Sequence, residues 1–289
     1  MRKPDTEKVI SEAKELGLPT EKAGRSLVWF DEFRDRDESL NKWFFRTQMN
    51  STDITLNTDE KHVEVSGGKL RLHTYRADGT DGIAYTLPQA LTTYGKMVFR
   101  RGYLEMRAKI PFRHGTWPSF WMLTYEPLME SRLRSEIDIF EIFSSPDTVV
   151  CNLHKSLRGP DGKIIARCKL DGTMISERRF KFKNPETLND EYHIYGMEWT
   201  EKELTFLVDD VPYVTLNIAD NYTDKEGLED MDCYQDYHFV ILNNFVFTPG
   251  HHWHPEAHLI QPEDPCPVDY TVDYIRLYQK DGEDILVED

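Results

Sequence analysis

The sequence predicts an all-β protein, a β-sandwich of antiparallel strands preceded by one short helix. From about residue 25 onward the apolar residues recur with a period of two, which is typical of half-buried strands. Turn residues separate these patterns, and no second helical pattern of comparable length follows. The chain has 289 residues, of which 39% are hydrophobic and 30% charged, so it can bury a sizeable core.

Residues 5–17 are expected to form the helix. Val9 and Ala13 lie along one apolar stripe, Asp5 can cap the first turn, and Gly17 ends the pattern. A helix this short needs a partner surface, so we expect it to extend the sandwich as an N-terminal element.

The strands follow in order along the chain. Residues 62–66 and 69–73 alternate apolar and polar side chains around a Gly67-Gly68 turn, which predicts a hairpin. The same alternation recurs at 103–110, 204–208 and 271–279. We therefore divide the chain into a helical extension (1–24), one β-sandwich domain (25–281) and a C-terminal tail (282–289).

The charge balance excludes some classes of partner. Lys plus Arg number 35 and Asp plus Glu number 51, a net charge of −16. Such a chain has no general affinity for nucleic acid or an anionic membrane, and it disfavours a polyanionic substrate unless a local basic patch intervenes. No run of 18 apolar residues is present, so no membrane span is expected. The four cysteines contain no CxxC pair, which disfavours a zinc knuckle.

The strongest local signal is the run SEIDIFEIF at residues 135–143. Glu136 and Asp138 are two residues apart, so in a strand they share one face, while Ile137 and Ile139 point the other way. Three carboxylates on one strand face repel one another unless they titrate as a set or hold a cation. An exposed acidic strand face and a carboxylate cation site are the alternatives to a catalytic set.

The third carboxylate has the wrong spacing for a regular strand. Glu141 is five residues from Glu136, but a β-bulge at about Ile139-Phe140 would return it to the acidic face. The same bulge would return Ile142 to the core, so the apolar pattern supports it independently. Side chains leaning together would then narrow a Cα separation of roughly 13 Å to about 5–6 Å, the separation found in retaining glycosidases.

The run GTWPSFWML at 115–123 precedes this strand and contains two tryptophans. Trp117 and Trp121 are four residues apart and share a strand face. Flat indoles stack on sugar rings, so we expect both to contribute to a sugar-binding cleft, with burial in the core as the alternative.

These segments resemble family 16 glycoside hydrolases, in the laminarinase- and agarase-like branch with the bulged E-x-D-x-x-E motif. Further stretches agree in the family's order: LVWFDEF at 27–33, YGKMVFRRGYLEMRAKIP at 94–111, YHIYGMEWTEKELTFLVDD at 192–210 and VDYIRLYQ at 272–279. The resemblance implies a jelly-roll β-sandwich of two antiparallel sheets with a concave substrate groove. It also implies a retaining, endo-acting mechanism.

The resemblance extends to individual residues. Glu136 resembles the nucleophile, Asp138 the assisting acid and Glu141 the general acid/base. His154 matches a position near the cleft, with a core or rim histidine as the alternative. No cofactor is expected for catalysis.

One loop departs from the common β-glucanase pattern. Asn243 lies in ILNNFVFTPG, where many members have a glycine-rich turn, and His251, His252, Trp253 and His254 follow. We expect Asn243 and Trp253 to contact substrate. A metal site at these histidines is the weaker alternative, because no acid or cysteine lies in register.

The resemblance implies a structural calcium site at Glu32, Gly68 and Asp273. Asp273 shares the parity of Ile275 and Leu277, so we expect it to point inward and to need a cation or a hydrogen-bond donor. A hydrogen bond to a neighbouring turn is the alternative.

Arg134 lies two residues before Glu136 and shares its face. It can bind a sulfate or a uronate, or it can pair with a neighbouring carboxylate. The first option is the main sequence feature that favours an anionic galactan as substrate.

The sequence thus predicts an endo-acting hydrolase of a β-1,3- or mixed-linkage glucan, and we expect a monomer. The alternatives are a β-galactan hydrolase of the agarase, porphyranase or carrageenase type and a non-catalytic sugar-binding sandwich. A polymeric substrate favours an extracellular protein. No apolar signal-peptide core follows the first residues, which instead favours the cytoplasm or a leader removed from this chain.

Overall fold

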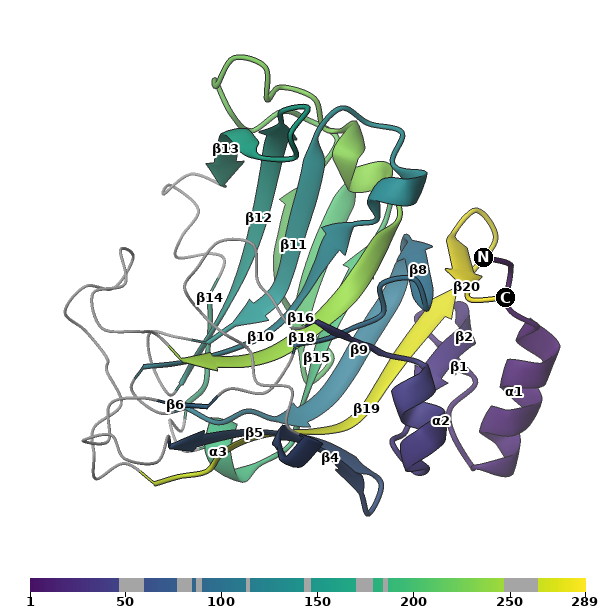
Figure 1. Cartoon of the computed structure of the whole chain (residues 1–289). Helices are drawn as coiled ribbons and strands as arrows, with labels where there is room; N and C mark the ends of the chain where they lie inside the picture. Colours follow the sequence, from purple (N-terminus) through teal and green to yellow (C-terminus); the bar gives the residue numbers. More distant parts are fainter. Residues whose placement is uncertain are drawn as a thin grey trace.

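The computed structural model describes residues 1–46, 60–76, 85–86, 90–112, 115–142, 147–169, 179–183, 187–246 and 265–289. Its described strands form two antiparallel sheets that curl and pack against each other (Figure 1). We name them the β11 sheet and the β19 sheet after a central strand of each. The prediction of an all-β sandwich is confirmed.

The β11 sheet carries the acidic run. Its strands are, in spatial order, β13 (Ile164–Lys169), β12 (Thr148–Arg158), β11 (Arg134–Glu141), β10 (Thr116–Thr124), β18 (His238–Val246), β7 (Ala90–Thr92) and β3 (Phe44–Arg46). Three further strands pair at its edges: β14 (Arg179–Lys181) with β12, β8 (Met97–Arg100) with β18, and β20 (Asp284–Val287) with β8.

The β19 sheet backs the β11 sheet. Its order is β1 (Glu21–Lys22), β2 (Arg25–Asp31), β19 (Val268–Gln279), β9 (Gly102–Lys109), β15 (His193–Trp199), β16 (Glu203–Val208) and β17 (Val211–Asn217). The predicted hairpin is present as β4 (Val63–Ser66) and β5 (Lys69–Arg76); β5 pairs with β19 and with β6 (Tyr85–Thr86).

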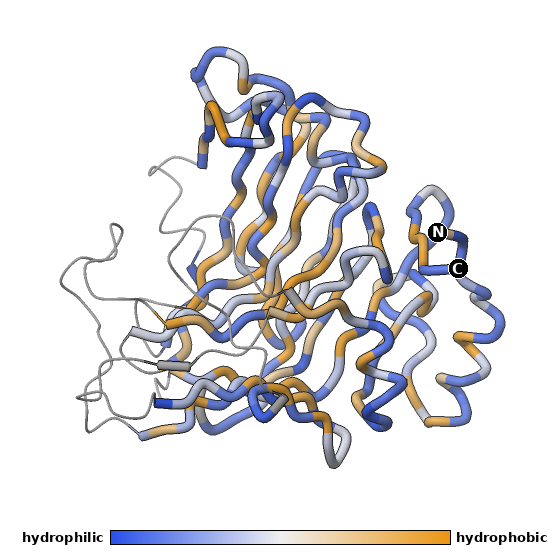
Figure 2. The backbone as a smooth tube through the Cα atoms, in the orientation of Figure 1, coloured by the Kyte–Doolittle hydropathy of each residue, from blue (hydrophilic) through white to orange (hydrophobic). Residues whose placement is uncertain are grey.

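Alternation along the strands places the core between the sheets. Leu104, Met106 and Ala108 of β9 are fully buried there and meet Ile137 of β11 within the same apolar cluster. Figure 2 shows the corresponding change between apolar and polar residues along the strands. Because the period of two is set by the pleat, the strand faces could be read from the sequence.

The N-terminal helix is α1 (Thr6–Glu15), and the side chain of Asp5 caps it by accepting a hydrogen bond from the Lys8 amide. Ala13 is fully buried against Leu27 and Phe30 of β2. The predicted helix is therefore confirmed, and the structure adds that it packs on the sandwich. The other described helices are short: α2 (Arg36–Asn41), α3 (Thr187–Asp190), η1 (Glu60–His62), η2 (Glu126–Leu128) and η4 (Asp232–Gln235).

The C-terminal tail holds more structure than expected. Residues 284–287 form β20, which pairs with β8, and Arg2 forms a bridge to Val287. The two ends of the chain thus lie side by side (Figure 1). No helix within the described ranges is long and apolar enough to cross a membrane.

Candidate active site

The acidic strand contains the predicted bulge. Between Asp138, opposite Asn152, and Glu141, opposite Val150, β11 advances three residues while β12 advances two. The pairing of β11 with β10 shows the same extra residue, which is Ile139. The bulge restores Glu141 to the face of Asp138, and the prediction is confirmed.

The opposite face of β11 explains why the bulge is stable. Ile137, Ile139 and Ile142 all belong to the central apolar cluster and are nearly or fully buried. Their burial holds β11 in a single register, because a one-residue slip would turn these side chains out of the core. The carboxylates are therefore positioned by the apolar residues between them.

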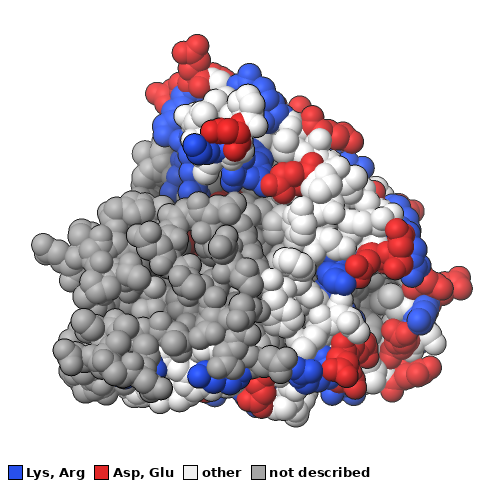
Figure 3. Space-filling model, viewed as in Figure 1, with Lys and Arg blue, Asp and Glu red and all other residues white. Residues whose placement is uncertain are grey.

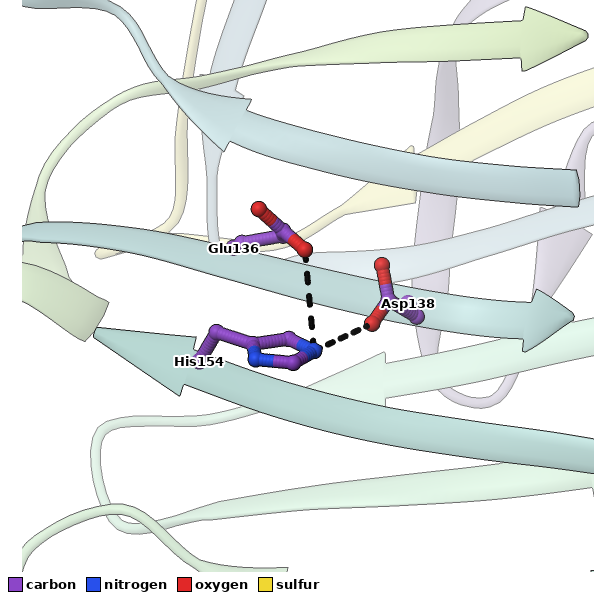
Figure 4. Close-up of side chains that lie close together, drawn as sticks. All are labelled: Glu136, Asp138 and His154. Carbon is purple, nitrogen blue, oxygen red and sulfur yellow. Dashed lines mark ion pairs between the residues drawn. The ribbon is translucent and has the colours of Figure 1, made fainter. Parts of the chain in front are cut away.

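Glu136, Asp138 and His154 form a compact cluster (Figure 4). His154 lies opposite Glu136 in the β11–β12 register, and its Nε2 is 3.3 Å from Asp138 Oδ2 and 3.6 Å from Glu136 Oε1. One ligand atom from each residue lies within 4.8 Å of the others, so the three side chains could also hold a metal ion. Two carboxylates and an imidazole suit a divalent metal, but the same atoms suit proton exchange.

Burial sets the charge of this cluster. Desolvation lowers the pKa of His154 to about 4, so the imidazole is neutral near neutral pH. Burial also raises the pKa of Glu136, and the repulsion of Asp138 adds to this effect. Arg167 on β13 opposes it by donating from Nη2 to Glu136 Oε1 at 2.8 Å, which favours the ionised carboxylate.

Glu141 has different surroundings. Trp117 Nε1 donates to its Oε1 at 3.0 Å, and the Asn152 side-chain amide donates to its Oε2. Burial, strengthened by the negative charge of Asp138, raises the pKa of Glu141 to about 7. This carboxyl group therefore carries a proton over most of the acidic range, which suits a general acid.

The two tryptophans of the upstream strand both lie at this face. Trp117 is half-buried and touches Glu141, whereas Trp121 lies opposite Asp138 and is only 9% exposed. Asn243 links them: it accepts from Trp121 Nε1 at 2.6 Å and donates to the Trp117 main-chain oxygen at 3.2 Å. Trp121 and Asn243 thus support Trp117, and the structure offers little of either to a substrate.

Arg134 forms an ion pair with Glu126. This agrees with the second of its two predicted roles, pairing with a neighbouring carboxylate. Arg134 also lines a pocket beside Glu136 and His154. Trp253 and the His251–His254 loop lie outside the described residues, so their predicted substrate contacts stay predictions.

The family model for glycosyl hydrolases family 16 matches residues 50–228, more than half of the chain. A β-glucanase of Rhodothermus marinus is 30% identical over 268 residues, covering 88% of this chain and 85% of the relative. The chain belongs to glycosyl hydrolase family 16. The resemblance recognised in its motifs is therefore confirmed.

Solved structures agree with the family 16 fold. The laminarinase of Rhodothermus marinus superposes with a TM-score of 0.64 at 25% identity, covering 88% of this chain and 96% of that one. A structure from work on endo-acting O-glycanases of the human gut microbiota that initiate mucin breakdown gives a TM-score of 0.65 at 26% identity, covering 91% and 93%. The jelly-roll sandwich that the resemblance implied is thus confirmed.

The residues expected to bind calcium in this family 16 chain have other partners. Lys69 Nζ lies 2.6 Å from Asp273 Oδ1 and 3.3 Å from the Gly68 oxygen, and Arg107 also pairs with Asp273. The Glu32 carboxylate is held by Arg276 at 2.7 and 3.0 Å. As they lie, these residues do not fit calcium, because Lys69 already bridges the Asp273 carboxylate and the Gly68 oxygen, and Arg276 holds the Glu32 carboxylate.

The expected inward direction of Asp273 is corrected for a related reason. In the pairing of β19 with β9, Val272 lies opposite Ala108 and Tyr274 opposite Arg107, so Asp273 is an extra residue. This bulge changes the parity of β19 and leaves the Asp273 side chain 20% exposed beside its two cations. Parity counted from Ile275 and Leu277 alone misses this change, which appears only when the buried Val272, three residues before Ile275, is included.

Two contacts at the site were missed in the sequence. Asn152 is two residues before His154, so its period-two spacing could have placed it on the same face. Arg167 lies on β13, opposite Ser156, and reaches Glu136 only through strand pairing. Nothing in the local sequence around Arg167 indicates that pairing.

Proposed function

We propose that this protein is a retaining, endo-acting hydrolase of a β-linked glucan. The observation that carries the proposal is the difference between two carboxyl groups on one strand face. Glu141 has a pKa raised to about 7 and holds a proton, while Glu136 is paired with Arg167. A proton donor beside a carboxylate nucleophile is the pair that retaining glycosidases use.

In the first step, Glu141 donates its proton to the glycosidic oxygen as the bond from that oxygen to the anomeric carbon breaks. A carboxylate oxygen of Glu136 forms a bond to the same carbon, which gives a glycosyl-enzyme and a shortened leaving chain. The hydrogen bonds from Trp117 and Asn152 keep the Glu141 carboxyl group aimed at the same point before and after proton transfer.

In the second step, the Glu141 carboxylate takes a proton from water. The resulting oxygen nucleophile attacks the anomeric carbon and releases Glu136. Asp138 and the neutral His154 lie beside Glu136. They can exchange a proton with each other as Glu136 loses its negative charge on forming the covalent bond and regains it when that bond breaks. Two inversions at one carbon retain its configuration.

The choice of glucan rests on the relatives. The Rhodothermus marinus relative, which is 30% identical, is a β-glucanase, and a solved structure at 25% identity is a laminarinase. The ion pair between Arg134 and Glu126 weakens the argument that Arg134 binds an anionic galactan.

A glucan polymer is met outside the cell, so we propose an extracellular place of action. We also propose that the protein acts as a monomer.

Reducing-sugar release from laminarin, barley mixed-linkage glucan, agarose, porphyran and κ-carrageenan tests the proposal. We expect release from a glucan, a product of retained configuration by proton NMR, and a kcat/KM that falls as the pH rises above about 7, where Glu141 ionises. Glu136→Gln should lower kcat more than about a thousandfold.

Glu12→Gln, an exposed substitution of the same type on α1, is the matched control and should keep full activity. An inverted product would overturn the mechanism. Hydrolysis confined to a galactan would overturn the glucan assignment. Binding without hydrolysis by the unmodified protein would support the sugar-binding alternative.

A further inference from the structure

A pocket beside Glu136 gathers positive charge in an acidic protein. Among the residues that line it are Arg134 of β11, Arg158 of β12 and Arg167 of β13. The chain as a whole has a net charge of −16, so three guanidinium groups around one pocket stand out from the overall composition. Figure 3 shows the basic side chains gathered at the end of the molecule where Figure 1 places β12 and β13.

The three arginines differ in their partners. Arg134 pairs with Glu126, and Arg167 pairs with Glu136. Arg158 donates from Nη1 to the Gly162 oxygen at 2.7 Å, and no carboxylate among the described residues pairs with it. Its Nε is buried and has no hydrogen-bond partner in the described part of the chain.

An unmatched guanidinium in this position is unfavourable without a ligand. Burial and the positive charge of Arg167 lower the pKa of Arg158, and the negative charge of Glu136 offsets them only in part. Arg167 already accounts for the cation beside the nucleophile, and Arg158 makes no contact with the carboxylate set. The hydrolytic steps proposed above therefore leave Arg158 without a role.

The chemistry of the pocket selects its ligand. A guanidinium fork binds the paired oxygens of a sulfate or carboxylate, and a partly buried fork binds them more strongly than one in water. Ser156 adds a hydroxyl group to the same lining. A neutral sugar hydroxyl would leave Arg158 without a direct ion pair among the described residues, with only the longer-range attraction of Glu136.

We propose that this pocket binds an oxyanion substituent, a sulfate ester or a carboxylate, carried by a sugar of the substrate chain close to Glu136. The inference rests on the proposed function and deepens it, because it names acidic β-glycans as a substrate class. Arg134 and Arg167 are already engaged in ion pairs with Glu126 and Glu136. Arg158 is therefore the residue that we expect to distinguish a glycan carrying a sulfate or carboxylate from an unsubstituted one.

The test compares kcat/KM on three probes: laminarin, laminarin bearing sulfate esters and a β-1,3-glucan oxidised to carboxylates at C6. We expect at least one anionic probe to be preferred over laminarin, with the preferred probe identifying the group. Arg158→Gln should reduce that preference about tenfold, the effect of losing one charge-assisted contact. Lys163→Gln removes an exposed charge from the neighbouring turn and should leave the preference intact.

A binding measurement separates this inference from the proposed function. Calorimetry with the Glu141→Gln variant should show tighter binding of a sulfated or carboxylated oligosaccharide than of a plain one, and adding Arg158→Gln should abolish the difference. If nothing is hydrolysed but this difference remains, only the proposed function fails. Equal binding of plain and anionic chains, or an equal effect of Arg158→Gln and Lys163→Gln, would overturn the pocket assignment.

Discussion

Glu136 and Glu141 have the same side chain and share one strand, yet their surroundings assign them different states. Burial and the charge of Asp138 raise the pKa of both carboxyl groups. Glu136 also accepts a charge-assisted hydrogen bond from Arg167, which favours its charged form, whereas Glu141 accepts from the neutral Trp117 and Asn152. Different partners of this kind let two identical groups act as nucleophile and acid at one pH. The difference depends on contacts from β10, β12 and β13 rather than on β11 itself.

Replacing Arg167 tests how the charge of Glu136 is maintained. Arg167→Gln removes the cation that opposes the raised pKa of Glu136, so this pKa should rise further. Because the nucleophile must be ionised, the acidic limb of the pH profile of kcat/KM should move to higher pH, so the loss of activity should be largest at the acidic end of the profile.

The basic limb, which reports Glu141, should move much less. Lys181→Gln, an exposed charge on β14, serves as the control and should leave both limbs in place. A uniform loss of activity at every pH would instead assign Arg167 a purely structural role.

At the scale of elements, bulges decide where charged side chains point. The bulge at Ile139 brings Glu141 to the face of Asp138, and the bulge at Asp273 turns that residue toward Lys69 and Arg107. The first could be predicted because Ile137 and Ile142 reveal the change of parity from both sides. The second leaves a similar mark, because Val272 and Ile275 both lie in the core although they are three residues apart, but the parity of Asp273 was counted from Ile275 and Leu277 alone.

The Lys69 ammonium group takes the place expected for calcium, so metal removal should have little effect. Chelation with EDTA should leave the Tm of the unmodified protein unchanged. Lys69→Ala should lower the free energy of unfolding by about 1 kcal/mol, since Lys69 and Asp273 are 27% and 20% exposed and water screens their attraction. Denaturation in urea with and without calcium would measure both effects.

In Lys69→Ala, millimolar calcium should restore part of the lost stability, because Asp273 and the Gly68 oxygen then lose their ammonium partner. Lys8→Ala on α1 is the control and should not respond to calcium. A large fall in Tm of the unmodified protein on chelation would show that calcium does bind there.

At the scale of the whole molecule, the raised pKa of Glu141 lowers the free energy of unfolding of the protein above neutral pH. Glu141 has a folded-state pKa of about 7 against an ordinary value of 4.5. A carboxyl group whose pKa is raised on folding contributes stability that is fully present below about pH 4.5 and is lost as the pH rises through about 7. Above that pH the folded protein holds a buried charge that the unfolded chain exposes to water.

Glu141→Gln should therefore become more stable relative to the unmodified protein as the pH rises. We expect the difference in free energy of unfolding between the two proteins to shift by about 3 kcal/mol between about pH 4.5 and pH 8. Urea denaturation at both pH values measures it, and the comparison cancels packing effects that do not depend on pH. Glu12→Gln should show no such shift, and a constant difference would refute the raised pKa of Glu141.

The sequence by itself determined the strand faces, the capped N-terminal helix, the bulged acidic strand and the family. Each of these depends on the spacing of residues along the chain, because a pleated strand alternates its side chains regardless of which strand it pairs with. The tertiary structure alone decided which cations meet which carboxylates. Arg167 reaches Glu136 and Lys69 reaches Asp273 across separate strands. Electrostatic pairing depends on distance in space, and a single sequence does not record which distant residues become neighbours.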